Sequence, residues 1–93
     1  MTKETLLLTL EAEKLKVGGE SISVPEEREA TFMIAGPSET IQVSKVVKIE
    51  SRESVLGLET AKGERYWFTY DLVLGVCFRL AKTAKEHTAG FSR

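Results

Sequence analysis

The chain has 93 residues, of which 42% are hydrophobic and 29% charged, and its formal net charge is −1. This length suits one compact domain, so we expect residues 1–93 to form a single unit. The near-neutral charge argues against strong binding to nucleic acid or to an anionic membrane. No apolar run approaches the ~20 residues of a membrane span, and the one cysteine fits a reducing compartment, so we expect a cytoplasmic protein.

Residues 5–17 have leucine at alternate positions and then change parity, and Gly18-Gly19 separates them from a second alternating run, 20–24. Two adjacent glycines accommodate the positive φ of a tight hairpin turn, so the pattern predicts paired strands. A helix over Thr2 to Val17 is the alternative, because Leu, Glu, Ala and Lys favour helices and glycine is a suitable helix end. We prefer the strands and leave the helix open.

The middle of the chain alternates between apolar and polar residues in four further runs, separated by Pro, Gly or charged residues. The runs are 30–35, 41–49, 56–60 and 65–70. In the second run we expect Val43 and Val47 to share the core face, with Lys45 interrupting it. Short connections join neighbouring strands, so residues 5–70 are predicted to form an antiparallel meander of six or seven strands.

Residues 71–88 are predicted to form one amphipathic helix that packs against the sheet, followed by a short tail, 89–93. Several non-apolar residues fall within one arc of the helical projection, namely Gly75, Arg79, Lys82 and Glu86. On this helix we expect Leu80 and Cys77 to be buried. A strand over 72–80 is the alternative that we leave open, because apolar residues also alternate there without a break.

The sequence holds no motif of a catalytic, metal or cofactor site. His87 is the only histidine, and no CxxC, HxxxH or HExxH spacing occurs. Cys77 has apolar neighbours, which is typical of a small buried side chain rather than a nucleophile. We therefore expect a protein that is not an enzyme and that holds neither a metal nor a cofactor.

As an order of elements, a strand meander that ends in a helix resembles the pleckstrin-homology-like (PH-like) superfold, including its GRAM and bacterial relatives. The residues that carry the resemblance are IQVSKVVKI (41–49), VLGLET (55–60) and RYWF (65–68), which lead to the predicted helix at Asp71. The resemblance implies a bent antiparallel sheet closed at one end by the helix, and binding of lipid headgroups or peptides. Only Lys14 and Lys16 flank the predicted first hairpin, where phosphoinositide-binding members place several Lys and Arg.

We expect a non-catalytic binding or adaptor module that recognises a protein partner or a second copy of itself. The candidate partner-binding residues are Leu74, Phe78, Ala81 and Trp67. The first three lie on an apolar arc wider than one sheet covers, and Trp67 lies on the outward face of its strand. The alternative is a small β-barrel of the SH3 or Sm type that binds nucleic acid, which a strand over 72–80 would favour. Aromatic residues near Lys62 and Arg65 would then supply stacking surfaces.

Overall fold

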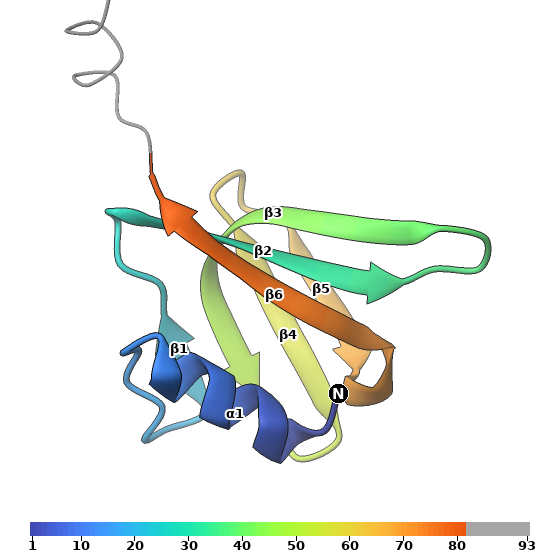
Figure 1. The fold of residues 1–93 in the computed structure, drawn as a ribbon, viewed down its shortest axis with the longest axis horizontal. Helices are drawn as coiled ribbons and strands as arrows, with labels where there is room; N and C mark the ends of the chain where they lie inside the picture. Colours follow the sequence, from blue (N-terminus) through green and yellow to red (C-terminus); the bar gives the residue numbers. More distant parts are fainter. Residues whose placement is uncertain (82–93) are drawn as a thin grey trace, which may run out of the picture.

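The computed structural model describes residues 1–81, which form one open sheet of six antiparallel strands and one α-helix near the N-terminus (Figure 1). The elements are α1 (Lys3–Ala12), β1 (Ser21–Ser23), β2 (Arg28–Ala35), β3 (Thr40–Ser51), β4 (Val55–Thr60), β5 (Arg65–Thr69), the 3-10 turn η1 (Tyr70–Leu72) and β6 (Val73–Leu80). The expectation of a mainly β protein built on an antiparallel meander is confirmed.

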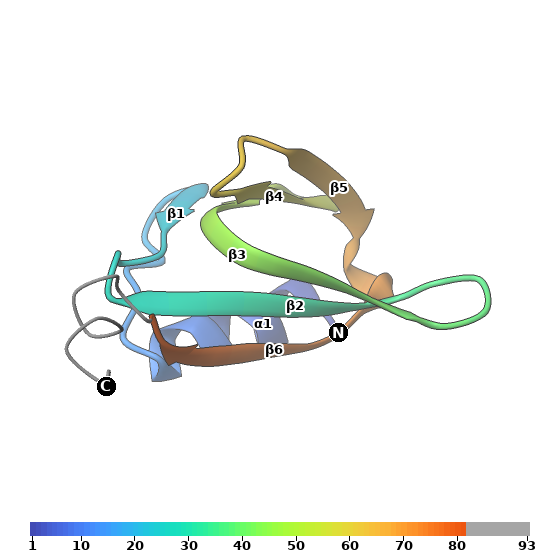
Figure 2. The same ribbon diagram turned by 90° about the horizontal axis from the view of Figure 1, so that it is seen from above.

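The chain runs through the meander from β2 to β5 and then returns, so that β6 lies beside β2. The strand order is β5-β4-β3-β2-β6, and β1 pairs with β3. Figure 2 shows β1, β4 and β5 in one layer and β2 and β6 in the other, with β3 passing between them. The sheet therefore folds back on itself and encloses the apolar side chains of both layers.

β3 joins the two layers because two extra residues bend it. The first extra residue lies near Lys45, whose φ is 56°: between the pairs that Val43 and Val46 form with β2, β3 has one residue more than β2. The second is Val47, which has no partner on β4. Such bulges increase local twist and bend a strand. They also shift the alternation, so Val46 is 2% exposed and Val47 is 41% exposed. The expectation that Val47 faces the core was wrong for this reason.

The N-terminal region is a helix rather than the predicted strand. The side chain of Thr2 caps α1 by accepting a hydrogen bond from the backbone N–H of Thr5 at 3.1 Å. Leu6 and Leu10 lie one turn apart and are completely buried, whereas Leu8 is exposed. α1 lies across one end of the folded sheet (Figure 1). A helix does close one end of the sheet, but it comes from the N-terminus.

The hairpin predicted at Gly18-Gly19 does not form. α1 ends before Lys14, whose φ is 69°, and the following segment reaches β1, which pairs with β3 instead of with residues 14–17. The Arg28 side chain anchors this segment, since its guanidinium donates to the Glu13 carbonyl oxygen at 2.5 Å and also pairs with the Glu13 carboxylate.

The helix predicted over 71–88 is wrong for residues 71–81, and the rest of that prediction, with the tail 89–93, lies outside the described residues. In η1, the Tyr70 hydroxyl donates to the Arg52 carbonyl oxygen at 2.5 Å, and β6 then pairs along β2 from Val73 to Leu80. Pairing with β2 satisfies the backbone groups on one side of this segment, and its β-branched and aromatic residues suit a strand. Tertiary pairing therefore outweighs the helical charge pattern.

The core is formed by the inward faces of the two layers and by α1. The apolar positions predicted to alternate in β2 and β4 do face the core, because Phe32, Ile34, Leu56 and Leu58 are all at most 1% exposed. Thr31 and Gly57, which lie at the alternate positions of the same strands, are buried as well. The remaining buried apolar residues include Leu6, Leu10, Ile22, Ala30, Val46, Ile49 and Val73.

Candidate partner-binding surfaces

β6 presents exposed leucine side chains at one end of the strand order. β6 ends the strand order beyond β2 and forms the outermost strand of its layer (Figure 2). Its side chains include Leu74, 57% exposed, and Leu80, 78% exposed. Arg79 is its one charged residue, and its Nε lies 3.9 Å from a carboxylate oxygen of Glu29 on β2. β6 thus combines a sheet edge with uncovered leucine side chains.

One hydrogen bond at the end of β6 shows which of its residues point their backbone N–H and C=O groups toward β2 and which point them away. The Ala81 N–H donates to the Glu27 carbonyl oxygen at 2.8 Å, so residue 81 directs its backbone groups toward β2. Backbone groups in an antiparallel pair alternate in direction along the strand. The N–H and C=O groups of Val76, Phe78 and Leu80 therefore point away from β2, toward the outer edge.

Three of the four predicted partner-binding residues lie on this strand or directly after it. Leu74 is well exposed, whereas Phe78 and Ala81 are half-buried. The Phe78 ring packs against the core and lies under the Arg28 guanidinium, 4.8 Å from its carbon to the ring centroid. Leu80 was predicted to be buried and is instead the most exposed leucine. It is the last residue of β6, at the end of the alternating run.

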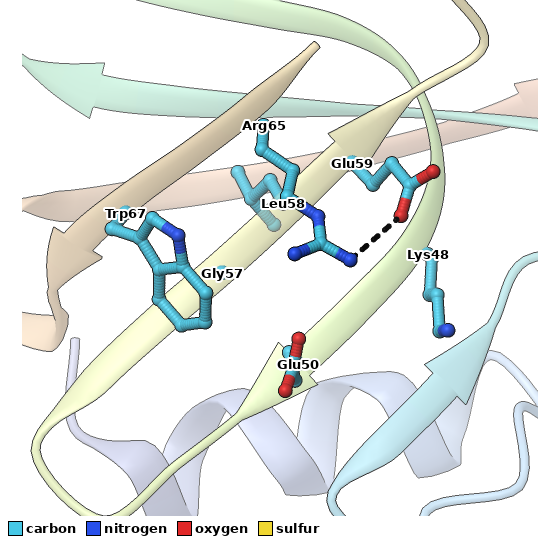
Figure 3. Close-up of a pocket in the computed structure, with 7 residues that line it drawn as sticks. All are labelled: Lys48, Glu50, Gly57, Leu58, Glu59, Arg65 and Trp67. Atoms are coloured by element: carbon cyan, nitrogen blue, oxygen red, sulfur yellow. Dashed lines mark ion pairs between the residues drawn. The ribbon is translucent and has the colours of Figure 1, made fainter. Parts of the chain in front are cut away.

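Trp67, the fourth predicted residue, lies on β5 at the opposite end of the strand order, so the structure does not bring it together with the other three. Trp67 is 46% exposed, and its indole lies over Gly57 of β4 (Figure 3). A Cβ atom at Gly57 would come within 2.8 Å of the ring, so only glycine allows this close approach.

Paired charges surround the indole on the same face. Arg65 lies 3.7 Å from Glu59, and the Arg52 guanidinium donates to the Glu50 carboxylate at 2.7 Å (Figure 3 shows the former pair). The bond from Arg52 lowers the pKa of the Glu50 carboxyl and raises the pKa of Arg52. The charges of this face largely balance, and the hollow beside Trp67 holds only about 10 Å³, about the space of one water.

A larger cleft of about 420 Å³ opens between the first half of β3 and β5. Its apolar wall includes Ile41, Val43, Tyr66 and Phe68, and the last two rings stack with centroids 6.2 Å apart. The Tyr66 hydroxyl donates to the Glu64 carboxylate at 3.0 Å, which raises the pKa of Tyr66. Lys45 and Lys62 also line the cleft, so it joins aromatic surface to two positive charges.

Cys77 is exposed on β6, which contradicts the expectation of a buried side chain. Residues 1–81 bring together no group of three or more His, Cys, Asp or Glu side chains that could hold a metal ion. Within the same part of the chain, no helix is long and apolar enough to cross a membrane. Besides the β6 edge, the Trp67 face and the cleft beside β5, residues 1–81 form a second cleft of about 420 Å³, whose lining includes Pro25, Val47 and Ala81.

Comparisons with models of protein families, with curated proteins and with solved structures find no match to this chain.

Proposed function

We propose that this chain is a non-catalytic binding module of the small SH3/Sm-like kind, which recognises a protein partner by adding a strand of that partner to the outer edge of β6. A second copy of the chain is the first partner to consider. One observation carries the proposal: an end strand of eight residues presents Leu74 and Leu80 to solvent, contains no proline and has a single charged residue.

The SH3/Sm-like interpretation is preferred to the PH-like one because of the chain segment after β5. The PH-like resemblance requires a helix there, whereas η1 and β6 occupy residues 70–80. β6 returns to β2, which leaves β5 and β6 as the two ends of a bent path of strands. This arrangement supports the small-barrel alternative.

Exposed edges support a binding role because they are normally protected. Soluble proteins blunt such edges with lysine, proline, bulges or a covering segment, since unpaired N–H and C=O groups recruit other strands. Strand addition uses these backbone groups for affinity and the alternate side chains for specificity. On β6, the outward groups of Val76 and Phe78 lie between the two exposed leucines, Leu74 and Leu80, which is the pattern that strand addition requires.

Sedimentation velocity at increasing protein concentration tests this proposal. We expect the wild type to associate reversibly, and Leu80→Lys to raise the dissociation constant by about tenfold, because a charge at the edge opposes pairing. Leu80 is 78% exposed, so the variant should fold with the circular dichroism of the wild type.

Leu8→Lys is the matched control, since Leu8 is 66% exposed but lies on α1. It should leave the dissociation constant unchanged. A wild type that stays monomeric at every concentration would exclude a second copy as the partner and leave only a partner of another kind. Equal weakening by both variants would show that the β6 edge is not the contact.

Nucleic-acid binding is the second candidate function, and the cleft beside β5 favours it. Base stacking on aromatic rings, combined with basic residues along the backbone path, is how single strands are bound without sequence preference. Tyr66 and Phe68 supply rings, and Lys45 and Lys62 supply charge. A titration with oligothymidine tests it. A dissociation constant below about 10 µM that rises with salt and with Lys62→Glu would establish this function. Weaker binding that ignores the substitution would eliminate it.

A further inference from the structure

We propose that the cleft beside β5 binds the C-terminal end of an extended peptide, which adds a strand to β3 and directs its terminal carboxylate toward Lys45 and Lys62. The cleft is formed by the first half of β3, the turn after β4 and one face of β5. This site is separate from the β6 edge and does not depend on strand addition there.

The first half of β3 has a neighbouring strand on one side only. It pairs with β2 from Thr40 onward, whereas its pairing with β4 begins at Val46 (Figure 2). The Gly36 N–H donates to the Glu39 carbonyl oxygen at 3.1 Å, so alternate residues counted from Glu39 point their backbone groups toward β2. The N–H and C=O groups of Thr40 and Gln42 therefore point away from β2, to a side where no strand of residues 1–81 pairs with them.

This side of β3 is blocked at the point where β4 joins it. The Ala61 N–H donates to the Lys45 carbonyl oxygen at 2.9 Å. Ala61 thus occupies the position that the next residue of an added strand would need. A strand laid along residues 40–44 ends there, so the end of a chain fits this place better than the middle of one.

The charges near the blocked end favour a carboxylate. Lys45 and Lys62 line the cleft, and neither forms an ion pair within residues 1–81. Glu64 also lines the cleft, but its carboxylate already accepts a hydrogen bond from the Tyr66 hydroxyl. Hydrogen bonds between an ammonium group and a carboxylate are among the stronger ones in proteins. A peptide whose last residue lies beside Lys45 supplies that carboxylate, and it then runs parallel to β3.

The apolar wall of the cleft is uncovered core surface. Tyr66 and Phe68 face two buried leucines of β4, so their rings lie on the core side of β5. Tyr66 is nevertheless 38% exposed, and Ile41 on β3 is 43% exposed. The volume of about 420 Å³ falls within the usual range of ligand pockets, about 300–1,000 Å³. Alternate side chains of an added strand would cover these groups.

The backbone groups of β3 distinguish a peptide from a single-stranded nucleic acid. Stacked bases would use the aromatic rings and the lysines, but would leave the N–H and C=O groups of Thr40 and Gln42 to water. A peptide strand uses the rings and the lysines and also pairs with these backbone groups. The peptide therefore accounts for more of the groups around the cleft.

Fluorescence anisotropy with a synthetic peptide tests this inference. The probe is fluorescein-labelled Gly-Ser-Thr-Leu-Thr-Leu with a free C-terminal carboxylate. We expect a dissociation constant on the order of 10–100 µM, and at least about tenfold weaker binding when the same peptide is amidated or extended by two glycines at its C-terminus. N-acetyl-leucine has the carboxylate but no strand, so it should also bind at least about tenfold more weakly than the probe.

Two pairs of variants separate the charge from the backbone edge. Lys62→Glu should weaken binding of the probe at least about fivefold, whereas Lys16→Glu, the same change at an exposed position between α1 and β1, should not. Gln42→Pro removes an N–H that points away from β2, which an edge position tolerates, so it should weaken binding. Gln42→Ala keeps this N–H and should leave binding unchanged.

Modified probes repeat the edge test on the wild-type protein, so the result does not depend on the folding of Gln42→Pro. Only alternate N–H groups of an added strand face its neighbour. Of two probes that are N-methylated at the last leucine or at the threonine before it, one should therefore bind at least about tenfold more weakly than the other. Equal binding of the two would contradict strand addition to β3.

The remaining outcomes each decide the matter. Absence of binding, equal affinity for the free and amidated probes, or equal weakening by Lys62→Glu and Lys16→Glu would overturn this inference. Oligothymidine that binds in a manner sensitive to Lys62→Glu, while the peptide does not bind, would assign the cleft to nucleic acid instead. Leu80→Lys should leave binding of the probe unchanged, so failure at this cleft and failure at the β6 edge are measured separately.

Discussion

Three leucines on α1 allow the packing of this helix to be measured with one substitution. Leu6 and Leu10 are 0% exposed and Leu8 is 66% exposed, although all three belong to the same short helix. Replacement by alanine changes the intrinsic helix propensity equally at each site, and by no more than a few tenths of a kcal/mol. Any difference among the variants therefore reports burial alone.

Removing a buried leucine side chain costs the transfer free energy of the lost methyl and methylene groups and the energy of the cavity left behind. We expect Leu6→Ala and Leu10→Ala each to lower the free energy of unfolding by about 2–5 kcal/mol. Leu8→Ala should change it by less than about 0.5 kcal/mol. A chain of this length has a total stability of about 5–14 kcal/mol, so the double variant Leu6→Ala/Leu10→Ala should be largely unfolded.

Urea denaturation followed by Trp67 fluorescence and by far-ultraviolet circular dichroism provides the measurement. Trp67 lies on β5, so coincident midpoints from the two signals would show that α1 and the sheet unfold together. If Leu8→Ala proved as costly as Leu6→Ala, the orientation of the helix described above would be refuted. Loss of the helical signal with an unchanged fluorescence midpoint would refute its role in closing the sheet.

Three further predictions concern single positions. Gly57→Ala should lower the free energy of unfolding by about 1–3 kcal/mol, because its Cβ would lie 2.8 Å from the Trp67 ring. Most of this loss should vanish when Gly57→Ala is made in a Trp67→Ala background, and an equal loss in both backgrounds would contradict the contact. Tyr70→Phe should cost about 1 kcal/mol near neutral pH through loss of a hydrogen bond. Burial raises the pKa of Tyr70, so the stability that its hydroxyl contributes is present below the unfolded pKa of about 10 and is lost as pH rises through the folded value. The difference from the wild type should therefore narrow in alkaline urea titrations, and a constant difference would be inconsistent with this burial. Gly63 has a φ of 86° and open space around it, so Gly63→Ala should lower the free energy of unfolding by about 1 kcal/mol in thermal melts through backbone strain alone. Lys45→Gly should cause no such loss, because glycine adopts the φ of 56° at this position readily. The reverse order would contradict these backbone conformations.

Regions where side chains alternate and turns are short could be predicted from the sequence. β2, β4 and β5 were expected close to their observed positions, because each strand pairs with a neighbour only a few residues away. The glycine turn at Gly63 follows the same local logic, since its positive φ requires no distant contact. Trp67 is exposed as predicted, but Tyr66, of the opposite parity, is exposed too, so parity alone does not explain it.

The two ends of the chain could not be assigned from local patterns alone. Leu6, Leu8 and Leu10 fit a strand, whereas Leu6 and Leu10 alone fit one face of a helix, and only the closed end of the sheet selects the second pattern. At the other end, residues 73–80 satisfy both periods. The available edge of β2 selects the strand, and this outcome exposes Cys77 and Leu80, which a helix would have buried.

For the predicted partner-binding residues, too, the sequence determined one part and the tertiary structure the other. The sequence by itself placed Leu74, Phe78 and Ala81 among apolar residues that exceed what one core needs, because composition and periodicity are local properties. Only the tertiary structure decided that they lie along an edge, that Trp67 is at the opposite end of the sheet, and that Val46 rather than Val47 is buried. The reason is that register, bulges and edge position depend on which distant strand becomes the neighbour, and no short stretch of sequence contains that choice.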